Sequence, residues 1–269
     1  MHLGHARTFW IAYQRALQAG GVLVFRDEDL DPQRSKPEFA RAMIDDLRWL
    51  GIEWQEGPDV GGPYVPYVQS QRRQFYVGAW RKLRNGGFLY PCTCSRNDLA
   101  DAPAAPHETP ELHSNDEPMY SGKCRNQTSY ATEPAGVNWR FRVPDGHAIR
   151  FEDGALGSQE YIAGRDFGDF VIWRRDDVPA YQLAVVVDDA AMKITEVVRG
   201  EDLLKSTARQ ILLYAALGLP APAWYHCTLM TDEAGVRLAK RHDALSLRKL
   251  QQSGLTAEEV RNRFGLRGC

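Results

Sequence analysis

The first residues of the chain have the types and spacing of a phosphate-binding helix start. His2, Gly4 and His5 stand directly before the apolar residues 9–13. A helix that begins here would offer unpaired N–H groups and the positive end of its dipole, which favour an anion. Gly4 has no side chain to hold a nucleotide away from the backbone. An exposed helix start with two incidental histidines, or a tag remnant, is the alternative that this segment alone leaves open.

Three of the five cysteines could bind a metal ion. They are close in sequence: Cys92, Cys94 and Cys124. This clustering favours a metal site in a reducing compartment over a disulfide framework. From the usual preference of zinc for nitrogen and sulfur we expect His107 or His113 as the fourth ligand, while Tyr120 lies four residues before Cys124. Three buried thiols without a metal are the alternative.

Charged residues follow two apolar runs of the sequence. Residues 22–25 are typical of a strand buried on both faces, and the acidic segment 26–31 comes next. Ligands of α/β folds bind beyond the carboxyl ends of strands, so these carboxylates could bind an ammonium group or ribose hydroxyls. A solvated loop is the equal alternative. Arg199 also ends an alternating segment, where its guanidinium could bind a carboxylate.

Hydrophobic periodicity indicates the elements that would position these residues. Helices are predicted over four segments: residues 3–19, 35–50, 71–85 and 206–217. Glycines end them, the second begins with a capping box, and Ser206 is the expected N-cap of the last. Residues 137–175 predict antiparallel hairpins with a turn at 144–146, and residues 194–199 predict a strand. Residues 181–189 are an apolar, buried helix or strand. We therefore expect an α/β host with an inserted antiparallel, metal-bearing domain.

The 269-residue chain has a globular composition, with 43% hydrophobic and 25% charged residues. It is long enough for one large domain or two modest ones. The net charge of −2 excludes a globally basic nucleic-acid binder, so a tRNA partner would need a local basic face. The sequence has neither an apolar stretch of ~18–20 residues nor a secretory signal, which predicts no membrane span and a cytoplasmic protein.

The motifs together resemble those of the class I aminoacyl-tRNA synthetases. His2-Leu3-Gly4-His5 is similar to the HIGH motif, and Leu238-Ala239-Lys240-Arg241 is similar to the end of the KMSKS loop. Three further segments resemble the glutamyl subgroup in order and spacing: residues 26–31, 181–189 and 198–204. The resemblance covers nearly the whole chain. It implies an α/β fold in which a Rossmann-type parallel sheet carries an inserted α+β, zinc-bearing, acceptor-stem-like domain.

A subgroup is indicated by the length of the chain and by its cysteines. Glutamyl-tRNA synthetases continue after the KMSKS loop into a large helical anticodon-binding region, whereas this chain ends soon after Arg241. The Cys-x-Cys…Tyr-x3-Cys spacing resembles the truncated paralogues, the glutamyl-queuosine tRNA(Asp) synthetases. That resemblance implies a ligase that activates L-glutamate with ATP, with Mg²⁺ on the nucleotide, and transfers it to the queuosine base of the tRNA(Asp) anticodon loop. The alternatives are a truncated glutamyl-tRNA synthetase that charges tRNA(Glu) and an inactive zinc- and RNA-binding remnant.

The resemblance also implies a role for each candidate residue. ATP would be bound by five residues, of which the histidines and the lysine are catalytic: His2, Gly4, His5, Lys240 and Arg241. Glutamate would be bound by Glu28 through its ammonium group, by Arg199 through a carboxylate, and by Tyr181 through a hydrogen bond. One structural zinc ion would be held by Cys92, Cys94, Cys124 and, instead of a histidine, Tyr120. We expect a monomer.

Two departures from the family pattern affect these expectations. The family begins with a strand and an Arg-Phe-Ala-Pro-Ser-Pro-type segment before the HIGH motif, whereas Met1 directly precedes His2 here. We expect either an upstream start or the loss of a core strand and part of the site, in which case residues 1–269 would be poorly stable and weakly active or inactive. Ala239 replaces the KMSKS serine, which puts the efficiency of the loop in question.

The predicted units are residues 1–80 and 177–250 for the two catalytic halves, 81–176 for the inserted zinc-binding domain and 251–269 for a short helical remnant.

Overall fold

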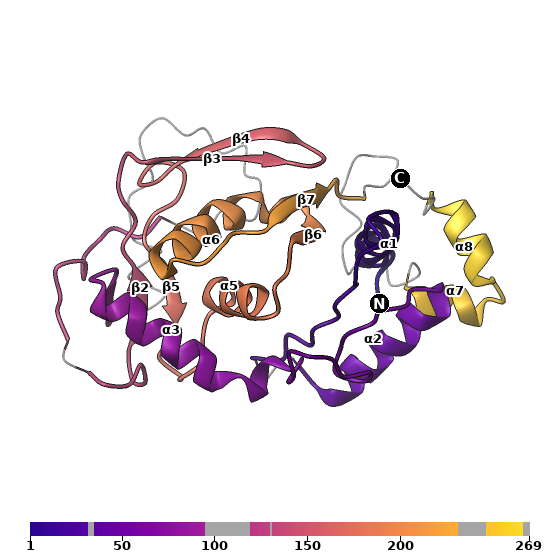
Figure 1. Cartoon of the computed structure of the whole chain (residues 1–269), viewed down its shortest axis with the longest axis horizontal. Coiled ribbons are helices and arrows are strands. Elements are labelled where there is room, and N and C mark those ends of the chain that lie inside the picture. The colour runs from indigo at the N-terminus through magenta and orange to yellow at the C-terminus, as the bar shows by residue number, and fades with distance from the viewer. Residues whose placement is uncertain (32–34, 95–118, 130, 231–245, 266–269) are drawn as a thin grey trace.

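A computed structural model describes residues 1–31, 35–94, 119–129, 131–230 and 246–265 of the chain (Figure 1). The helices are α1 (Leu3–Gln18), α2 (Pro37–Leu50), α3 (Arg73–Asn85), α5 (Tyr181–Ala191), α6 (Leu204–Leu217), α7 (Leu247–Gln252) and α8 (Ala257–Arg263), with 3-10 turns η1 (Gln69–Gln71) and η2 (Glu201–Leu203). The strands are β1 (Leu89–Cys92), β2 (Asn138–Phe141), β3 (Ala148–Asp153), β4 (Gly157–Ile162), β5 (Phe170–Trp173), β6 (Glu196–Gly200) and β7 (Ala223–Cys227).

The strands form two sheets, one mixed and one antiparallel. The mixed sheet has the order β4-β3-β7-β6, in which β7 runs parallel to both of its neighbours and β4 runs antiparallel to β3. The antiparallel sheet has the order β1-β2-β5. The expected parallel pairing is therefore present between β6 and β7. The sheet as a whole is mixed, because it also contains the antiparallel pair β3 and β4.

The predicted hairpin about residues 144–146 is wrong, although the strands on either side of the turn exist. β2 pairs with β1 and β5, whereas β3 pairs with β4 and β7, so the turn carries the chain from one sheet to the other. Alternation in the sequence fixes which side chains share a face, but it does not choose the partner strand. The antiparallel hairpin of β3 and β4 is confirmed.

The helices begin and end largely where glycine and proline predict. Gly51 and Gly218 take left-handed conformations, with φ of 89° and 61°, directly after α2 and α6. Two details are wrong. α2 begins at Pro37 after Lys36, which makes no side-chain cap, and the N-cap of α6 is Leu203 instead of the predicted Ser206. The ambiguous apolar segment 181–189 is helical and lies in α5.

Residues 22–25 are not the strand that their apolar run predicts. Val24 makes an isolated parallel bridge to Glu56, and Asp27 makes one to Val68. An apolar run indicates burial, but a strand also needs a neighbour along its whole length. Among the described residues this segment has such contact on one side only, at single positions.

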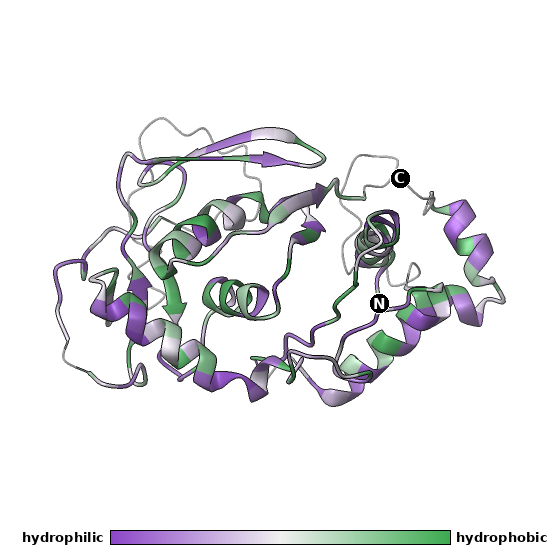
Figure 2. Ribbon diagram, viewed as in Figure 1, coloured by the Kyte–Doolittle hydropathy of each residue, from purple (hydrophilic) through white to green (hydrophobic). Residues whose placement is uncertain are grey.

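The described residues form two large hydrophobic clusters, and Phe25 of this segment belongs to the smaller one. The larger packs α3, α5 and α6 against the sheets, and Trp80 meets Trp139 edge-on at 4.9 Å between ring centroids. The smaller joins α1 and α2 to α7 and α8, with Leu3, Leu47 and Leu250 among its buried members. Figure 2 shows hydrophobic residues on the interior sides of α5 and α6 and hydrophilic residues along α8. No helix among the described residues is long and apolar enough to cross a bilayer.

Candidate active site

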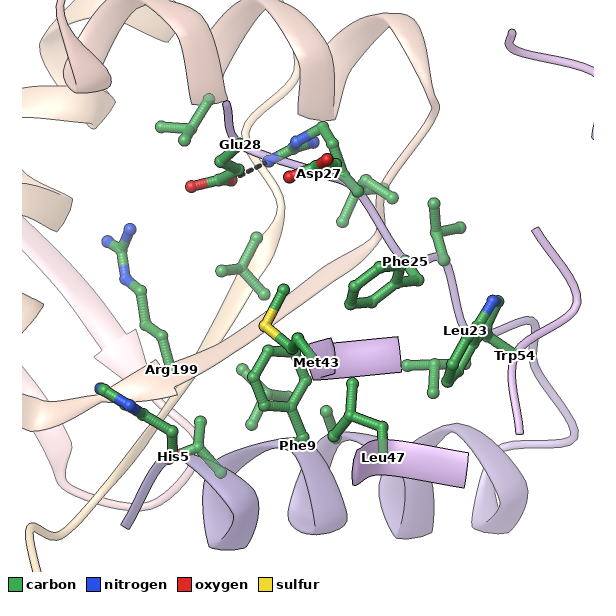
Figure 3. Close-up of a pocket in the computed structure, with 18 of the residues that line it drawn as sticks. His5, Phe9, Leu23, Phe25, Asp27, Glu28, Met43, Leu47, Trp54 and Arg199 are labelled. Carbon is green, nitrogen blue, oxygen red and sulfur yellow. Dashed lines mark hydrogen bonds and ion pairs between the residues drawn. The ribbon is translucent and has the colours of Figure 1, made fainter. Parts of the chain in front are cut away.

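A groove with a volume of about 2390 Å³ lies between α1, α2, residues 21–29 and β6. Its walls bring together the N-terminal end of α1 and the carboxyl end of β6, which the sequence places almost 200 residues apart (Figure 3). Pockets for a single small molecule are usually ~300–1000 Å³, so this groove has room for more than one. The floor is apolar, with Phe9, Phe25 and Leu47 among the residues that line it.

The N-terminus of α1 opens onto the groove. α1 begins at Leu3, its N-cap His2 makes no side-chain cap, and the first turn has no acidic residue. The ring nitrogens of His2 are buried and have no hydrogen-bond partner among the described residues. A Cβ built on Gly4 would meet no atom within 4 Å, so the groove reaches the backbone there. This end of the helix therefore offers donors and space to an anion.

Three residues predicted to share a site do share the groove. Glu28 follows the segment that crosses the groove, Tyr181 begins α5, and Arg199 lies near the end of β6. The Arg199 Nη1 atom is 3.4 Å from the Tyr181 hydroxyl. Figure 3 shows the Arg199 guanidinium and the Glu28 carboxylate pointing into the same space, with His5 beside Arg199. The groove thus places a cation and a carboxylate across from each other.

Glu28 is held by Arg26, which the sequence motif does not mark as a site residue. Arg26 Nη2 donates to Glu28 Oε1 at 2.9 Å, and Arg26 Nη1 donates to Asp189 Oδ1 at 2.7 Å. Asp189 is buried on α5, so the loop that carries Glu28 is tied to the helix that carries Tyr181. Desolvation in the groove, together with the nearby Glu28 carboxylate, raises the pKa of Tyr181. Its hydroxyl therefore stays protonated at neutral pH.

Asp188, the neighbour of Asp189, forms a buried network beneath the groove. Its carboxylate accepts from Arg72 Nε at 2.6 Å, from Gln69 Nε2 at 2.8 Å and from the Tyr76 hydroxyl at 2.8 Å. Burial and the Asp188 carboxylate raise the pKa of Tyr76. The sequence signal for this network is the pair of consecutive aspartates in an apolar segment. A buried carboxylate needs hydrogen-bond or charged partners, so the pair predicts polar residues packed against it.

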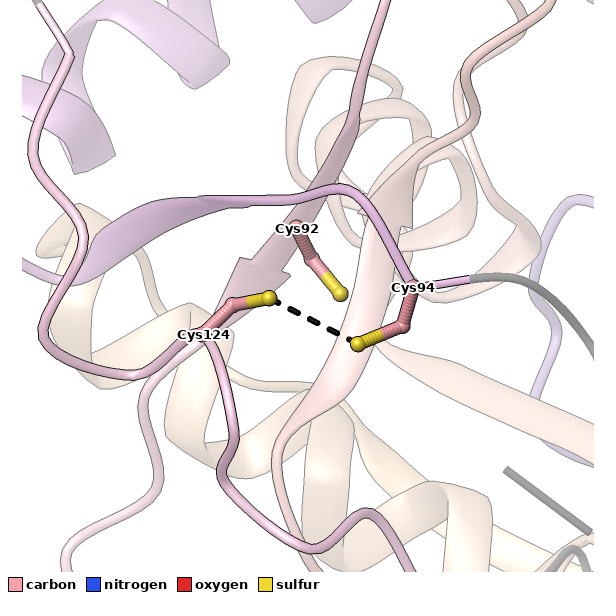
Figure 4. A group of neighbouring side chains, drawn as sticks. All are labelled: Cys92, Cys94 and Cys124. Atoms are coloured by element: carbon pink, nitrogen blue, oxygen red, sulfur yellow. Dashed lines mark hydrogen bonds between the residues drawn. The ribbon is translucent and has the colours of Figure 1, made fainter. Parts of the chain in front are cut away.

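The three predicted cysteines lie together, away from the groove. Their Sγ atoms are within 4.8 Å of one another, and those of Cys94 and Cys124 are 3.5 Å apart (Figure 4). A tetrahedral zinc ion with Zn–S bonds of ~2.3 Å would place its sulfurs about 3.8 Å apart, so the cluster could hold a metal ion. The Tyr120 hydroxyl is 3.5 Å from Cys92 Sγ and 3.6 Å from Cys94 Sγ.

The surroundings of the cysteine cluster favour the thiolate of Cys124, whereas burial raises the pKa of the Cys94 thiol. Burial opposes ionisation of Cys124, but hydrogen bonding with Tyr120, the Thr93 backbone and the other two thiols lowers its pKa to about 7. Arg140 donates from Nε to Cys92 Sγ at 3.3 Å and brings a buried positive charge to the cluster. Thiolate is the metal-binding form of cysteine, so these contacts suit a metal site.

Several predicted residues lie outside the described part of the chain. They are Lys240 and Arg241 of the KMSKS-like loop, and His107 and His113, which were considered as zinc ligands. Two buried residues were not predicted at all, namely His226 on β7, which contacts Arg199, and Asp153 on β3, which contacts His226. The signal for them is weak in the sequence, because a lone histidine in an alternating strand usually belongs to the core.

Comparisons with known proteins agree with this arrangement. The model of the family "tRNA synthetases class I (E and Q), catalytic domain" matches residues 1–269. Proteins named glutamyl-Q tRNA(Asp) synthetase from Symbiobacterium thermophilum and Nitratidesulfovibrio vulgaris are 48% and 46% identical over 265 residues, which is 97% of this chain and 80% of each relative. A glutamate-tRNA synthetase structure from Elizabethkingia anophelis matches with a TM-score of 0.76 and 28% identity, over 95% of this chain and 52% of that chain.

Proposed function

The chain belongs to the class I tRNA synthetases of the E and Q type, and on this premise we propose that it activates L-glutamate with ATP and transfers it to the queuosine base in the anticodon loop of tRNA(Asp). The names of its two relatives at 46% and 48% identity support this activity over others in the family. The observation that carries the proposal is the groove itself, which sets a guanidinium across from a carboxylate beside an open helix N-terminus.

Glutamate fits the charges that face each other in the groove. The Arg199 guanidinium would bind a carboxylate in a forked pair, and Glu28 would bind the ammonium group. The Tyr181 hydroxyl would complete the site as a neutral hydrogen-bond partner. Their common position on the groove and the 3.4 Å contact between Arg199 and Tyr181 support these roles.

ATP would lie with its phosphates at the start of α1, against His2, Gly4 and His5. In the first step a glutamate carboxylate oxygen attacks the α-phosphorus, the bond to the pyrophosphate breaks, and glutamyl-adenylate forms. Transfer to the tRNA base then releases AMP. Because no protein group changes its bonding, the chain acts by positioning the reactants and by stabilising charge. Lys240, with Arg241, would neutralise charge on the pyrophosphate, and Mg²⁺ bound with the nucleotide would supply further positive charge.

One structural zinc ion would be held by Cys92, Cys94, Cys124 and Tyr120. An oxygen ligand at ~2.0 Å from zinc would lie about 3.5 Å from each sulfur ligand, and the Tyr120 hydroxyl has this separation from two of the three. Because the site lies away from the groove, its role would be structural. Metal binding would stabilise the folded form of the loops that carry the ligands. Purified protein should contain one zinc per chain. Cys124→Ser should lose it, whereas Cys227→Ser, which changes a buried cysteine on β7, should keep it.

We propose that the groove also accepts one further extended strand, between β6 and residues 22–27. In the part of the chain that the structure describes, β6 is an edge strand of its sheet, and Leu23, Phe25 and Val197 line the space beside it. An unpaired edge next to an apolar wall is suited to a parallel strand. A peptide of the Arg-Phe-Ala-Pro-Ser-Pro type, added in trans or fused before Met1, should raise the melting temperature and the activity. The proposal would be contradicted if neither the added peptide nor the fusion changed the melting temperature or the activity.

Three wider features of the protein are proposed on the same premise. The cysteine cluster and the β1-β2-β5 sheet fall within residues 81–176, which supports an inserted zinc-binding domain between the catalytic halves 1–80 and 177–250, although β3 and β4 of this range share the mixed sheet with β6 and β7. The helices α7 and α8 fall in or next to residues 251–269. We further propose that the enzyme works as a monomer in the cytoplasm, where its tRNA is found. Light scattering on the purified protein would test the monomer.

Glutamate-dependent ATP–pyrophosphate exchange without tRNA tests the proposed activity. Wild-type protein supplied with the strand peptide should catalyse exchange with glutamate, because the paralogues that the chain resembles activate glutamate without tRNA. Arg199→Leu should abolish it, while Arg150→Leu, on the exposed face of β3, should not. Charging of tRNA(Glu) at its acceptor end would instead favour a truncated glutamyl-tRNA synthetase. Binding of zinc and tRNA without exchange in any form would indicate the inactive remnant.

A further inference from the structure

Two side chains that do not line the groove hydrogen-bond to Arg199 on the side away from the groove. The residue is only 8% exposed. Its Nη2 atom donates to the Thr207 hydroxyl at 2.6 Å, and its Nε atom donates to His226 Nε2 at 3.2 Å. The Nη1 atom lies on the groove side, next to Tyr181. A flexible guanidinium is thus fixed on one edge and presented on the other.

The parallel strands place three side chains in a row behind the groove. In the register of β6 and β7, Arg199 lies beside His226, and β3 brings Asp153 next to β7 at Trp224. His226 is fully buried, and its Nδ1 atom is 2.5 Å from Asp153 Oδ2. The row therefore runs Asp153, His226, Arg199 across the mixed sheet.

The hydrogen-bond chemistry of this row fixes the tautomer of His226. An arginine Nε can only donate, so His226 Nε2 must accept and cannot carry a proton. The ring proton then lies on Nδ1 and is donated to Asp153. Asp153 remains ionised, because it also accepts from the backbone N–H groups of Ala155 and Leu156 at 3.0 Å each. These bonds and the bond with His226 outweigh the burial that opposes ionisation, and lower the pKa of Asp153.

We propose that Asp153 and His226 are positioning residues for the recognition of the substrate carboxylate by Arg199. The Asp153 carboxylate holds the proton on His226 Nδ1, which leaves the Nε2 lone pair to anchor Arg199 Nε. The anchored guanidinium then meets the carboxylate without first losing the freedom of a mobile side chain. This inference rests on the proposed role of Arg199 in glutamate binding.

A low pH should disturb this arrangement. The groups that face His226 are Asp153 from β3, Arg199 from β6, Asp202 from η2 and Thr207 from α6. Burial lowers the pKa of His226, and the charge of Arg199 lowers it further against the opposing effect of Asp153. The imidazole is therefore neutral at neutral pH. Protonation would set a second N–H against Arg199 Nε and release the guanidinium, which should raise the KM for glutamate.

Asp153→Asn tests the proposal without changing the buried volume. The Asn amide can donate to His226 Nδ1, which favours the tautomer with the proton on Nε2 and turns a donor toward Arg199. We expect the KM for glutamate to rise about tenfold or more, as for a lost hydrogen bond to a charged group, with kcat and the KM for ATP little changed. The control is Asp169→Asn, which alters a buried aspartate that pairs with Tyr90, the Val143 backbone and Arg125 and does not line the groove.

The tautomer is measured directly by ¹⁵N NMR of histidine ring nitrogens in the full chain. Wild-type protein should show a proton on His226 Nδ1, and Asp153→Asn should show it on Nε2. An Nε2–H or doubly protonated ring in the wild type at pH 7.5 would overturn the proposal. So would a KM for glutamate that Asp153→Asn changes no more than Asp169→Asn does.

A pair of His226 variants gives a second test if Asp153→Asn does not fold. Gln can place an oxygen near the position of Nε2 and keep the acceptor for Arg199, whereas Asn can only replace the Nδ1 donor to Asp153. His226→Gln should therefore retain a lower KM for glutamate than His226→Asn, and the reverse order would overturn the proposal. Failure of the proposed function can be told apart from failure of this inference. In the first case the wild type would show no glutamate-dependent exchange, while the NMR measurement would still report the tautomer of His226.

Discussion

Gly4→Ala should make the protein more stable and less active at the same time. Gly4 lies in the first turn of α1, where glycine costs backbone entropy relative to alanine. A Cβ at this position would meet no protein atom within 4 Å, so the substitution brings no clash in the free protein. The same methyl group would stand where the ATP phosphates are proposed to approach the backbone.

The two effects have different sizes. Replacement of glycine by alanine in a helix stabilises by up to about 1 kcal/mol, which for a chain of this size is a rise of about 2–4 °C in melting temperature. If the methyl group displaces the phosphates and removes one charge-assisted hydrogen bond, the loss is about 1.5–3 kcal/mol of ATP binding. That corresponds to an increase of about 10- to 150-fold in the KM for ATP, with a smaller effect on the KM for glutamate.

Thermal unfolding and ATP–pyrophosphate exchange measure the two effects. The matched control is Gly78→Ala, an exposed glycine within α3 whose added Cβ would also meet nothing within 4 Å. It should give a similar gain in stability and leave both KM values unchanged. An unaltered KM for ATP in Gly4→Ala would refute the placement of the phosphates at α1. A clear loss of stability would refute the description of Gly4 as open.

Three further outcomes follow from the buried groups. Asp188→Asn should lower the free energy of unfolding in urea by about 3 kcal/mol, because Arg72 loses its buried charge partner, whereas Glu160→Gln in an exposed pair should cost under about 1 kcal/mol. Removal of zinc by a chelator should lower the melting temperature of the wild type but not of Cys124→Ser. Because the pKa of His226 is lowered on folding, stability should fall as the pH drops below about 6.5, by less in His226→Gln; stability rising with acid would contradict this.

Much of the fold was accessible from the sequence where local chemistry decides. Glycine ends α2 and α6 through left-handed conformations, and amphipathic spacing predicts the helices between such stops. The segment 22–25 was not accessible, because an apolar run does not say whether a neighbouring strand is present. The prediction of a hairpin about residues 144–146 was wrong for a related reason. The partner strands of β2 and β3 depend on the topology of two sheets and not on the turn between them.

The site divides in the same way. Glu28, Tyr181 and Arg199 were predicted through motif resemblance, and the structure brings them to one groove. The residues that hold them were missed, because their partners are distant in sequence. Asp153 and His226 are 73 residues apart and meet only through the order of β3, β7 and β6. Such support follows from strand register and cannot be read from local spacing.

The most direct test of the central claim is where labelled glutamate is attached to tRNA. The protein, with ATP, Mg²⁺ and radiolabelled glutamate, is incubated with queuosine-containing tRNA(Asp) or with tRNA(Glu), and the tRNA is then cleaved into fragments by a ribonuclease. We predict label in the anticodon-loop fragment of tRNA(Asp), and none when queuosine is replaced by guanosine. Label at the acceptor end of tRNA(Glu), with none in the anticodon loop of tRNA(Asp), would contradict the account.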